Sequence, residues 1–329
     1  MKDHPDAWRR LVAAVVESFE TPVLEAYDGD EEESLLFTDL RQQFILAGVE
    51  HLERFRNPTP WLQIGVAVRD GRQAFELLLG PLHRALRRWR ADGRFEHFFF
   101  MLKEPGIRLR FAGPDLYRGL RPELIAVLDE ELAAGRHLGH GMSVYDAETY
   151  QFGGETGLEI AHRLFTVDSL AILDLRAAEV RPQTLPILSL TLLNHLLREL
   201  TEDPWEMWDA WCNMRLTHRL PTLRPEGVAR AEAGFERFRP ALEKAVWRPE
   251  EVISELPAAA RSVMRSSFEE NVAVAERLRR AADEGQLLYG PRKIFPFYVI
   301  FQWNRWMIPL AMQRTLTLYM ERLLDPKIE

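Results

Sequence analysis

Cysteine is nearly absent from this sequence of 329 residues, and its scarcity excludes several classes of protein. The one cysteine, Cys212, leaves no internal disulfide framework and no cysteine-rich zinc or iron–sulfur site. A single free thiol is typical of a reducing compartment, so we expect a cytoplasmic protein. The first residues carry acidic side chains and a proline where a signal peptide needs a basic start and an apolar run, and we expect no export signal.

Long hydrophobic runs and an excess of positive charge are also missing. The most apolar stretch, residues 185–197, is shorter than the ~20 residues that a membrane helix needs, and Asn194 and His195 interrupt it. It is typical of a buried helix, so we expect no membrane association. The 50 acidic and 42 basic residues give a formal net charge of −8, which argues against a general nucleic-acid binder. A hydrophobic fraction of 47% is that of a folded soluble protein.

Cofactor motifs are missing as well. The sequence contains neither a phosphate-binding loop ending in Gly-Lys-Ser/Thr nor a dinucleotide-binding fingerprint. Its histidines are scattered without the spacing of metal ligands. We therefore expect neither a cofactor nor a metal.

The hydrophobic pattern predicts two units. Helical spacing over residues 7–20 and 40–56 precedes Asn57-Pro58-Thr59-Pro60, a strong stop signal, and we expect an N-terminal helical segment over residues 1–60. From residue 61 the order is strand, helix, strand, strand, helix, strand, which is that of a ferredoxin-like unit. The expected ranges are strands at 61–68, 98–102, 107–111 and 143–152, and helices at 73–90 and 122–134.

The rest of the chain has helical spacing. The expected helices cover 159–174, 185–200, 204–219, 225–246, 257–284 and 297–324. The predicted fold class is α+β, a ferredoxin-like core with extensive helical additions, and residues 61–329 are expected to form one compact unit.

Two arginines follow the turn at residues 104–106. Alternation along a strand places Arg108 and Arg110 on one face, while Ile107, Leu109 and Phe111 occupy the other. Two guanidinium groups side by side can hold a carboxylate or an oxyanion. The alternative is a solvated face on which both arginines pair with carboxylates.

Two further segments carry polar and aromatic side chains. Residues 145–154 end in Gly153-Gly154, which permit positive φ angles or a close approach of the backbone to a peptide ligand; read alone, the segment is only a turn. Residues 297–306 interleave aromatic and polar groups on a predicted helix. There the alternative is a half-buried aromatic face from which Asn304 and Arg305 bind neighbouring elements.

Together these segments resemble the thiopeptide-type bacteriocin biosynthesis family, the domain that forms the C-terminal elimination part of lantibiotic dehydratases. The resemblance rests on their order and spacing along the chain: Trp61-Leu62, Phe98 to Phe100, Ile107 to Phe111, Tyr145 to Gly154, Leu164-Phe165, Asp168-Ser169 and Asn304-Arg305. It implies one of three stand-alone types. These are the elimination half of a split dehydratase, a thiopeptide pyridine synthase, or a protein with altered or lost chemistry.

Three departures from the family pattern disfavour elimination of glutamate. Elimination domains of this family carry a histidine before the first strand arginine, an arginine before the Gly-Gly pair and a histidine four residues before Asn-Arg. This sequence has Ile107, Gln151 and Ile300 at those positions. Elimination needs an acid or base for the α-proton and a cation for the departing carboxylate, which these side chains cannot provide.

The resemblance therefore favours a thiopeptide macrocyclase, or pyridine synthase. Such an enzyme joins two dehydroalanines of a modified ribosomal precursor peptide in a formal [4+2] aza-cycloaddition, with loss of water and of the leader peptide. The predicted catalytic set has Tyr150 or Tyr298 donating to the amide carbonyl and Glu148 shuttling a proton, with Gln151 beside them. The predicted substrate-binding residues are Arg108, Arg110, Tyr145, Gln302, Asn304 and Arg305.

The expected partner is a precursor peptide with a leader and a core that contains azoles and dehydroalanines. Two alternatives stay open: the glutamate-eliminating half of a split lantibiotic-type dehydratase, and a non-catalytic scaffold that binds leader peptides. The sequence does not decide between a monomer and a homodimer.

Overall fold

A computed structural model describes residues 61–217 and 225–327. The predicted helices at 7–20 and 40–56 lie outside the described residues, so the N-terminal segment 1–60 and its boundary stay predictions. Among the described helices, none is long and apolar enough to cross a membrane.

The first half of the described chain is a four-stranded antiparallel sheet in the order β2-β3-β1-β4. Its strands are β1 (Trp61–Ala67), β2 (His97–Lys103), β3 (Gly106–Ala112) and β4 (Gly139–Ser143). This order, with helical connections after β1 and β3, is the predicted ferredoxin-like topology. The hairpin between β2 and β3 turns at Glu104-Pro105, with Gly106 beginning β3 because a Cβ there would lie 2.1 Å from the Val66 carbonyl oxygen.

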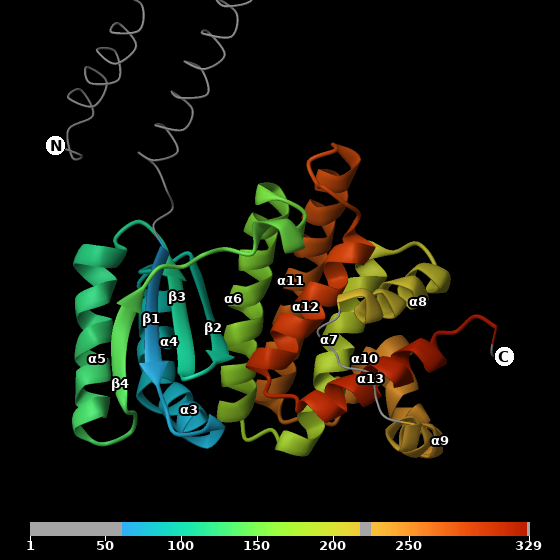
Figure 1. The fold of residues 1–329 in the computed structure, drawn as a ribbon, viewed down its shortest axis with the longest axis horizontal. Helices are drawn as coiled ribbons and strands as arrows, with labels where there is room; N and C mark the ends of the chain where they lie inside the picture. The colour runs from blue at the N-terminus through green and yellow to red at the C-terminus, as the bar shows by residue number, and fades with distance from the viewer. Residues whose placement is uncertain (1–60, 218–224, 328–329) are drawn as a thin grey trace, which may run out of the picture. The chain divides into compact units, whose positions relative to one another are not determined.

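The last strand, β4, ends at Ser143, the residue at which the sequence predicts it to begin. It covers 139–143, whereas residues 145–148 form a loop and Thr149–Phe152 a short helix, η4. Pairing with β1 stops at Ser143, where Gln63 Nε2 donates to Ser143 Oγ at 2.7 Å and to the Val144 carbonyl at 3.0 Å. The chain then runs past the upper ends of the strands toward α6 (Figure 1).

Helices cover one face of the sheet. They are α3 (Gly71–Leu77), the turn η2 (Leu78–Leu82), α4 (His83–Ala91), η3 (Leu116–Leu120) and α5 (Arg121–Ala133). The predicted helix at 73–90 thus exists with a kink at Gly80, one residue before Pro81. Leu62, Ile64, Leu109 and Phe111 of the sheet belong to this core, as the alternation predicts.

The second half of the chain is helical. Its long elements are α6 (Glu155–Ala177), α7 (Leu185–Leu200), α8 (Pro204–Cys212), α9 (Pro225–Trp247), α10 (Pro249–Ser254), α11 (Ala258–Asp283), α12 (Pro291–Arg305) and α13 (Leu310–Leu323), and the short ones are η5 (Pro182–Thr184) and η6 (Asn213–Thr217). Helix α6 stands beside the edge strand β2 (Figure 1). The single helix predicted at 297–324 is two helices, because Met307 has a φ of 51° and Pro309 cannot continue α12.

Candidate functional site

The sheet face opposite α3, α4 and α5 carries the candidate site. Strand register places Phe99, Arg110, Gln63 and Ser143 in one row across the sheet. The neighbouring row contains Met101, Arg108, Gly65 and Gly141. The two arginines therefore share a face, as the sequence predicts, and their surroundings differ.

Arg110 is buried, and it has no ionic partner in the part of the chain that the structure describes. Its side chain is 4% exposed, and its Nε donates to Gln63 Oε1 at 2.6 Å. The guanidinium carbon lies 5.0 Å from the centre of the Phe99 ring and 4.3 Å from that of Tyr145, at distances typical of cation–π contacts. Nη1 has no hydrogen-bond partner, and no carboxylate of the described residues forms an ion pair with the group. Burial lowers the pKa of Arg110.

Tyr145 and His162 form a neutral hydrogen-bonded pair beside this cation. Tyr145 Oη lies 2.9 Å from His162 Nε2, and Trp61 packs against both rings. Burial raises the pKa of Tyr145 and lowers that of His162 to about 3. Both groups are therefore uncharged near neutral pH, and either can donate to the other depending on the imidazole tautomer.

We call Arg110, Gln63, Phe99, Tyr145 and His162 the Arg110 cluster. The sequence places His162 near the Gly-Gly pair, where it could reach the site, but a structural role is favoured and it is not among the predicted site residues. The sequence signal that could have found it is its place on the helix two residues before Leu164-Phe165, a segment that carries the family resemblance.

Two other predicted residues lie on the segment that leads from Tyr145 to α6. Glu148 is half-buried, and its charge acts on both Arg110 and Tyr145. Gln151 lies on η4 with its Oε1 buried and without a hydrogen-bond partner. Glu148 is thus electrostatically coupled to the cluster.

The two tyrosines predicted to donate to substrate lie elsewhere. Tyr298 is 1% exposed, packs against Phe152, and has a hydroxyl without a hydrogen-bond partner. Its hydroxyl therefore lies among aromatic rings outside the Arg110 cluster, and its role as a donor to substrate stays a prediction. Tyr150 is 75% exposed, and its ring packs against Tyr289 at a separate cavity of about 330 Å³ that Lys293 also lines.

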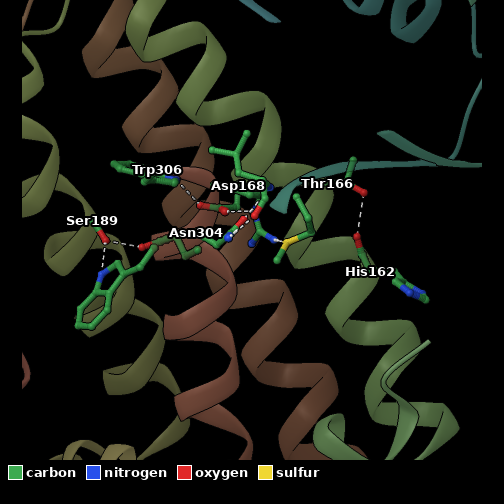
Figure 2. A network of polar contacts seen from close by, with 11 residues as sticks. His162, Thr166, Asp168, Ser189, Asn304 and Trp306 are labelled. Atoms are coloured by element: carbon green, nitrogen blue, oxygen red, sulfur yellow. Dashed lines mark hydrogen bonds and ion pairs between the residues drawn. The ribbon is translucent and has the colours of Figure 1, made fainter. Parts of the chain in front are cut away.

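The predicted substrate-binding residues of α12 instead hold the fold together. Asn304 clamps the edge strand: its Oδ1 accepts from Leu102 N and its Nδ2 donates to Leu102 O, both at 2.8 Å. Gln302 Oε1 accepts from Ser189 Oγ at 2.5 Å, which joins α12 to α7 (Figure 2). Both amides are occupied by protein partners.

Arg305 forms a buried ion pair in the same network. Its Nε donates to Asp168 Oδ2 at 2.6 Å, with side chains 1% and 4% exposed. Trp306 Nε1 donates to the other Asp168 oxygen at 2.7 Å (Figure 2). The carboxylate and the guanidinium satisfy one another away from solvent, so the structure gives Arg305 a role in joining α12 to α6 in place of the predicted contact with substrate.

Acidic and histidine side chains do not gather into a metal-binding group. Within residues 61–217 and 225–327, no three His, Cys, Asp or Glu side chains are placed to hold an ion.

Comparison with known families and structures identifies the group to which this sheet and its helices belong. Residues 61–324 match the family model described as lantibiotic biosynthesis dehydratase C-term. The chain belongs to this family. Comparison with curated proteins gave no match.

Solved structures share the fold. The tRNA-dependent lantibiotic dehydratase MibB from Microbispora sp. 107891 is 20% identical, with a TM-score of 0.58 over 82% of this chain. This chain corresponds to 28% of MibB. The structure of TsrL is 20% identical with a TM-score of 0.56, covering 81% of this chain and 94% of TsrL. The pyridine synthase TbtD from thiomuracin biosynthesis is 14% identical with a TM-score of 0.53, covering 82% and 98%.

Proposed function

We propose that this member of the family is an enzyme that modifies a ribosomal precursor peptide, and that its reaction is pyridine formation from two dehydroalanines. The observation that carries the proposal is the Arg110 cluster, where a buried cation with a free N–H faces a neutral phenol–imidazole pair. Such a site suits a reaction that moves protons without forming a full charge. The fold also resembles that of the pyridine synthase TbtD over 98% of the TbtD chain, which supports the same assignment.

The first step of the proposed reaction is tautomerisation of the amide whose nitrogen belongs to the first of the two dehydroalanines to react. The amide oxygen gains a proton and the nitrogen loses one, which gives an iminol and completes a 2-azadiene. Tyr145 and His162 can exchange a proton along their hydrogen bond, so this pair can donate at one atom while it accepts at another. The free Nη1 of Arg110 is the donor that would stabilise negative charge building on the oxygen.

The ring then forms by closure of two carbon–carbon bonds: the β-carbon and the iminol carbon at the two ends of the azadiene each bond to one alkene carbon of the second dehydroalanine. Loss of the iminol oxygen as water and of the leader as an amide leaves the aromatic pyridine. Orientation supplies most of the rate in this scheme, because holding two reacting groups in line is worth effective molarities of ~10⁵ M or more. In this scheme Tyr145 takes the role predicted for Tyr150 or Tyr298, and Glu148 keeps the role of proton shuttle.

The structure weakens one of the three arguments against glutamate elimination. Ile107 is buried in the core on the opposite face from Arg108, so its identity does not bear on the site. The case against elimination therefore rests on Gln151 and Ile300. His162 is a candidate base for elimination as well, and its pKa of about 3 makes it a weak base in either reaction.

Mass spectrometry of a synthetic precursor peptide tests the proposal. The peptide carries azoles and two dehydroalanines, and it is incubated with the purified full chain. We expect a leader amide and a core lighter by the leader and one water, together with pyridine absorbance. A glutamylated peptide serves as the parallel substrate: loss of glutamate there, with no change in the first peptide, would establish the elimination alternative. Binding of both peptides without a change in mass would establish the scaffold alternative.

A further inference from the structure

The sheet face that carries the Arg110 cluster is almost bare at its other end. There the side-chain positions are occupied by Gly65, Ala67, Gly139 and Gly141, in two rows next to the row of Arg110. We call these four residues the glycine trough. They lie on the floor of a cavity of about 350 Å³ that Lys103, Arg108 and Ser143 also line.

The trough is open because side chains are missing. A Cβ atom built on Gly139 or Gly141 meets nothing within 4 Å, and one built on Gly65 meets only the Gly141 carbonyl oxygen, at 3.9 Å. Neither backbone strain nor a steric clash therefore requires glycine at these three strand positions. Glycine in a strand interior costs stability and often marks a close approach by another backbone or a ligand.

Two cations border the trough, and neither has an ion-pair partner within residues 61–217 and 225–327. No carboxylate of the described residues forms an ion pair with Arg108 or Lys103, although the same helix-rich protein pairs many of its other arginines. Lys103 is exposed and Arg108 half-buried. They occupy diagonally adjacent positions on neighbouring strands, and at such positions long side chains can reach a common ligand.

We propose that the glycine trough binds an extended segment of the peptide substrate, with a carboxylate of that segment held between Arg108 and Lys103. A floor of backbone without side chains lets another backbone approach closely, and the two cations select an anionic group. The inference rests on the proposed function only in taking a peptide as the substrate.

Continuity with the Arg110 cluster links the trough to the reaction. Arg108 and Arg110 are two residues apart on β3, which corresponds to about 6.8 Å along a strand. A peptide that crosses the trough therefore continues directly over the row of Arg110. The trough would fix the register of the peptide, and the cluster would act on the residues that follow.

Binding of simple acidic peptides by the full chain tests the proposal without any reactive substrate. The probe is a fluorescent octapeptide that alternates serine and glutamate and ends in an amide, followed by fluorescence anisotropy. A serine–glutamine octapeptide amide removes the side-chain carboxylates, and the same peptide as a free acid isolates the C-terminal one. We expect the glutamate peptide or the free acid to bind, the neutral amide to bind about tenfold or more weakly, and binding to weaken as salt increases.

Variants of the trough provide the controls. Gly141→Val fills the open space with a residue that favours strands, so we expect an unchanged or higher melting temperature and about tenfold weaker binding. Gly65→Ala is the milder version. Arg108→Met and Lys103→Met should each weaken binding about tenfold, whereas Arg279→Met, an exposed arginine on α11, should leave it within about twofold.

Equal binding of the probe by wild type and by a folded Gly141→Val variant would overturn the proposal. It would also be overturned if wild type bound the serine–glutamate amide, the serine–glutamine amide and the serine–glutamine free acid equally well. These results are independent of pyridine formation, because the probes contain no dehydroalanine. A trough that binds the probes in a protein that leaves the precursor peptide unchanged would contradict the proposed reaction alone.

Discussion

Two arginines are buried in this protein in opposite ways. Arg305 lies against the carboxylate of Asp168, which Trp306 also holds, so each charged group is satisfied by the protein. Arg110 contacts the neutral amide of Gln63 and two aromatic rings, and its Nη1 has no hydrogen-bond partner among the described residues. Burying a cation without an ion-pair partner is costly, and such a group calls for an explanation other than stability. The comparison separates an arginine whose charge the protein satisfies from one whose hydrogen-bonding capacity it leaves partly unused.

The largest effect is expected at the satisfied arginine. Arg305→Met leaves Asp168 as a buried carboxylate without its cation, and breaking such a pair costs about 3–5 kcal/mol of unfolding free energy. Urea unfolding monitored by circular dichroism measures it, with Arg279→Met as the exposed control, for which we expect a change within about 0.5 kcal/mol. A loss of less than about 1 kcal/mol of unfolding free energy for Arg305→Met would contradict the view that Arg305 stabilises the fold.

A pH effect of intermediate size is expected from the Arg110 cluster. The pKa of His162 is lowered from 6.5 to about 3 by burial, so between pH 7 and pH 5 the unfolded chain takes up a proton that the folded chain does not. The unfolding free energy therefore decreases as the pH is lowered from 7 to 5. His162 accounts for about 2 kcal/mol of this decrease at pH 5. Urea unfolding of wild type and His162→Gln at both pH values should show a smaller fall in the variant. Equal falls would mean that His162 is not buried as a neutral group.

Removing the unsatisfied arginine should cost little. Arg110→Met deletes a desolvated cation and leaves Gln63 short of one donor, so the two effects oppose one another and we expect a change within about 1 kcal/mol. The same urea experiment decides it. A loss as large as that of Arg305→Met would show that both arginines serve the fold.

The smallest effect is expected at Tyr150, which lies outside the Arg110 cluster. Its phenol is 75% exposed, so Tyr150→Phe should change the unfolding free energy by less than about 0.5 kcal/mol and the rate of peptide conversion by less than about twofold. Tyr145→Phe is the matched variant, for which we expect slower conversion because the hydrogen bond to His162 is lost. Similar rates for the two variants would remove Tyr145 from the mechanism.

The sequence predicted the fold well where periodicity is strong. The alternation of Arg108 and Arg110 with Leu109 placed the two arginines on one sheet face, and helical spacing located α6 and α7 within a few residues. It failed where one residue overrides the pattern. Nothing local in the sequence reveals that β4 ends at Ser143, beside Gln63 of β1, whereas Pro309 is a local stop signal that the prediction of one helix over 297–324 passed over.

The site was harder to predict than the fold because polar residues on a helix serve either purpose. Asn304 and Arg305 are polar groups among aromatics, and only the structure shows that their partners are Leu102 and Asp168. Tyr298 lies one helical turn from other aromatic residues and is fully inside. His162 joins the cluster through Tyr145, which is 17 residues away in the chain, and this pairing depends on the path of the loop after β4.

The rate at which wild type and Arg110→Met convert the peptide with two dehydroalanines, followed by mass spectrometry, tests the central claim most directly. If the free guanidinium stabilises the reacting oxygen, wild type yields the pyridine-containing core, and the folded variant is slower by about 10²–10³-fold. Conversion by the variant at the wild-type rate would contradict the claim that Arg110 is buried and unpaired in order to act on substrate.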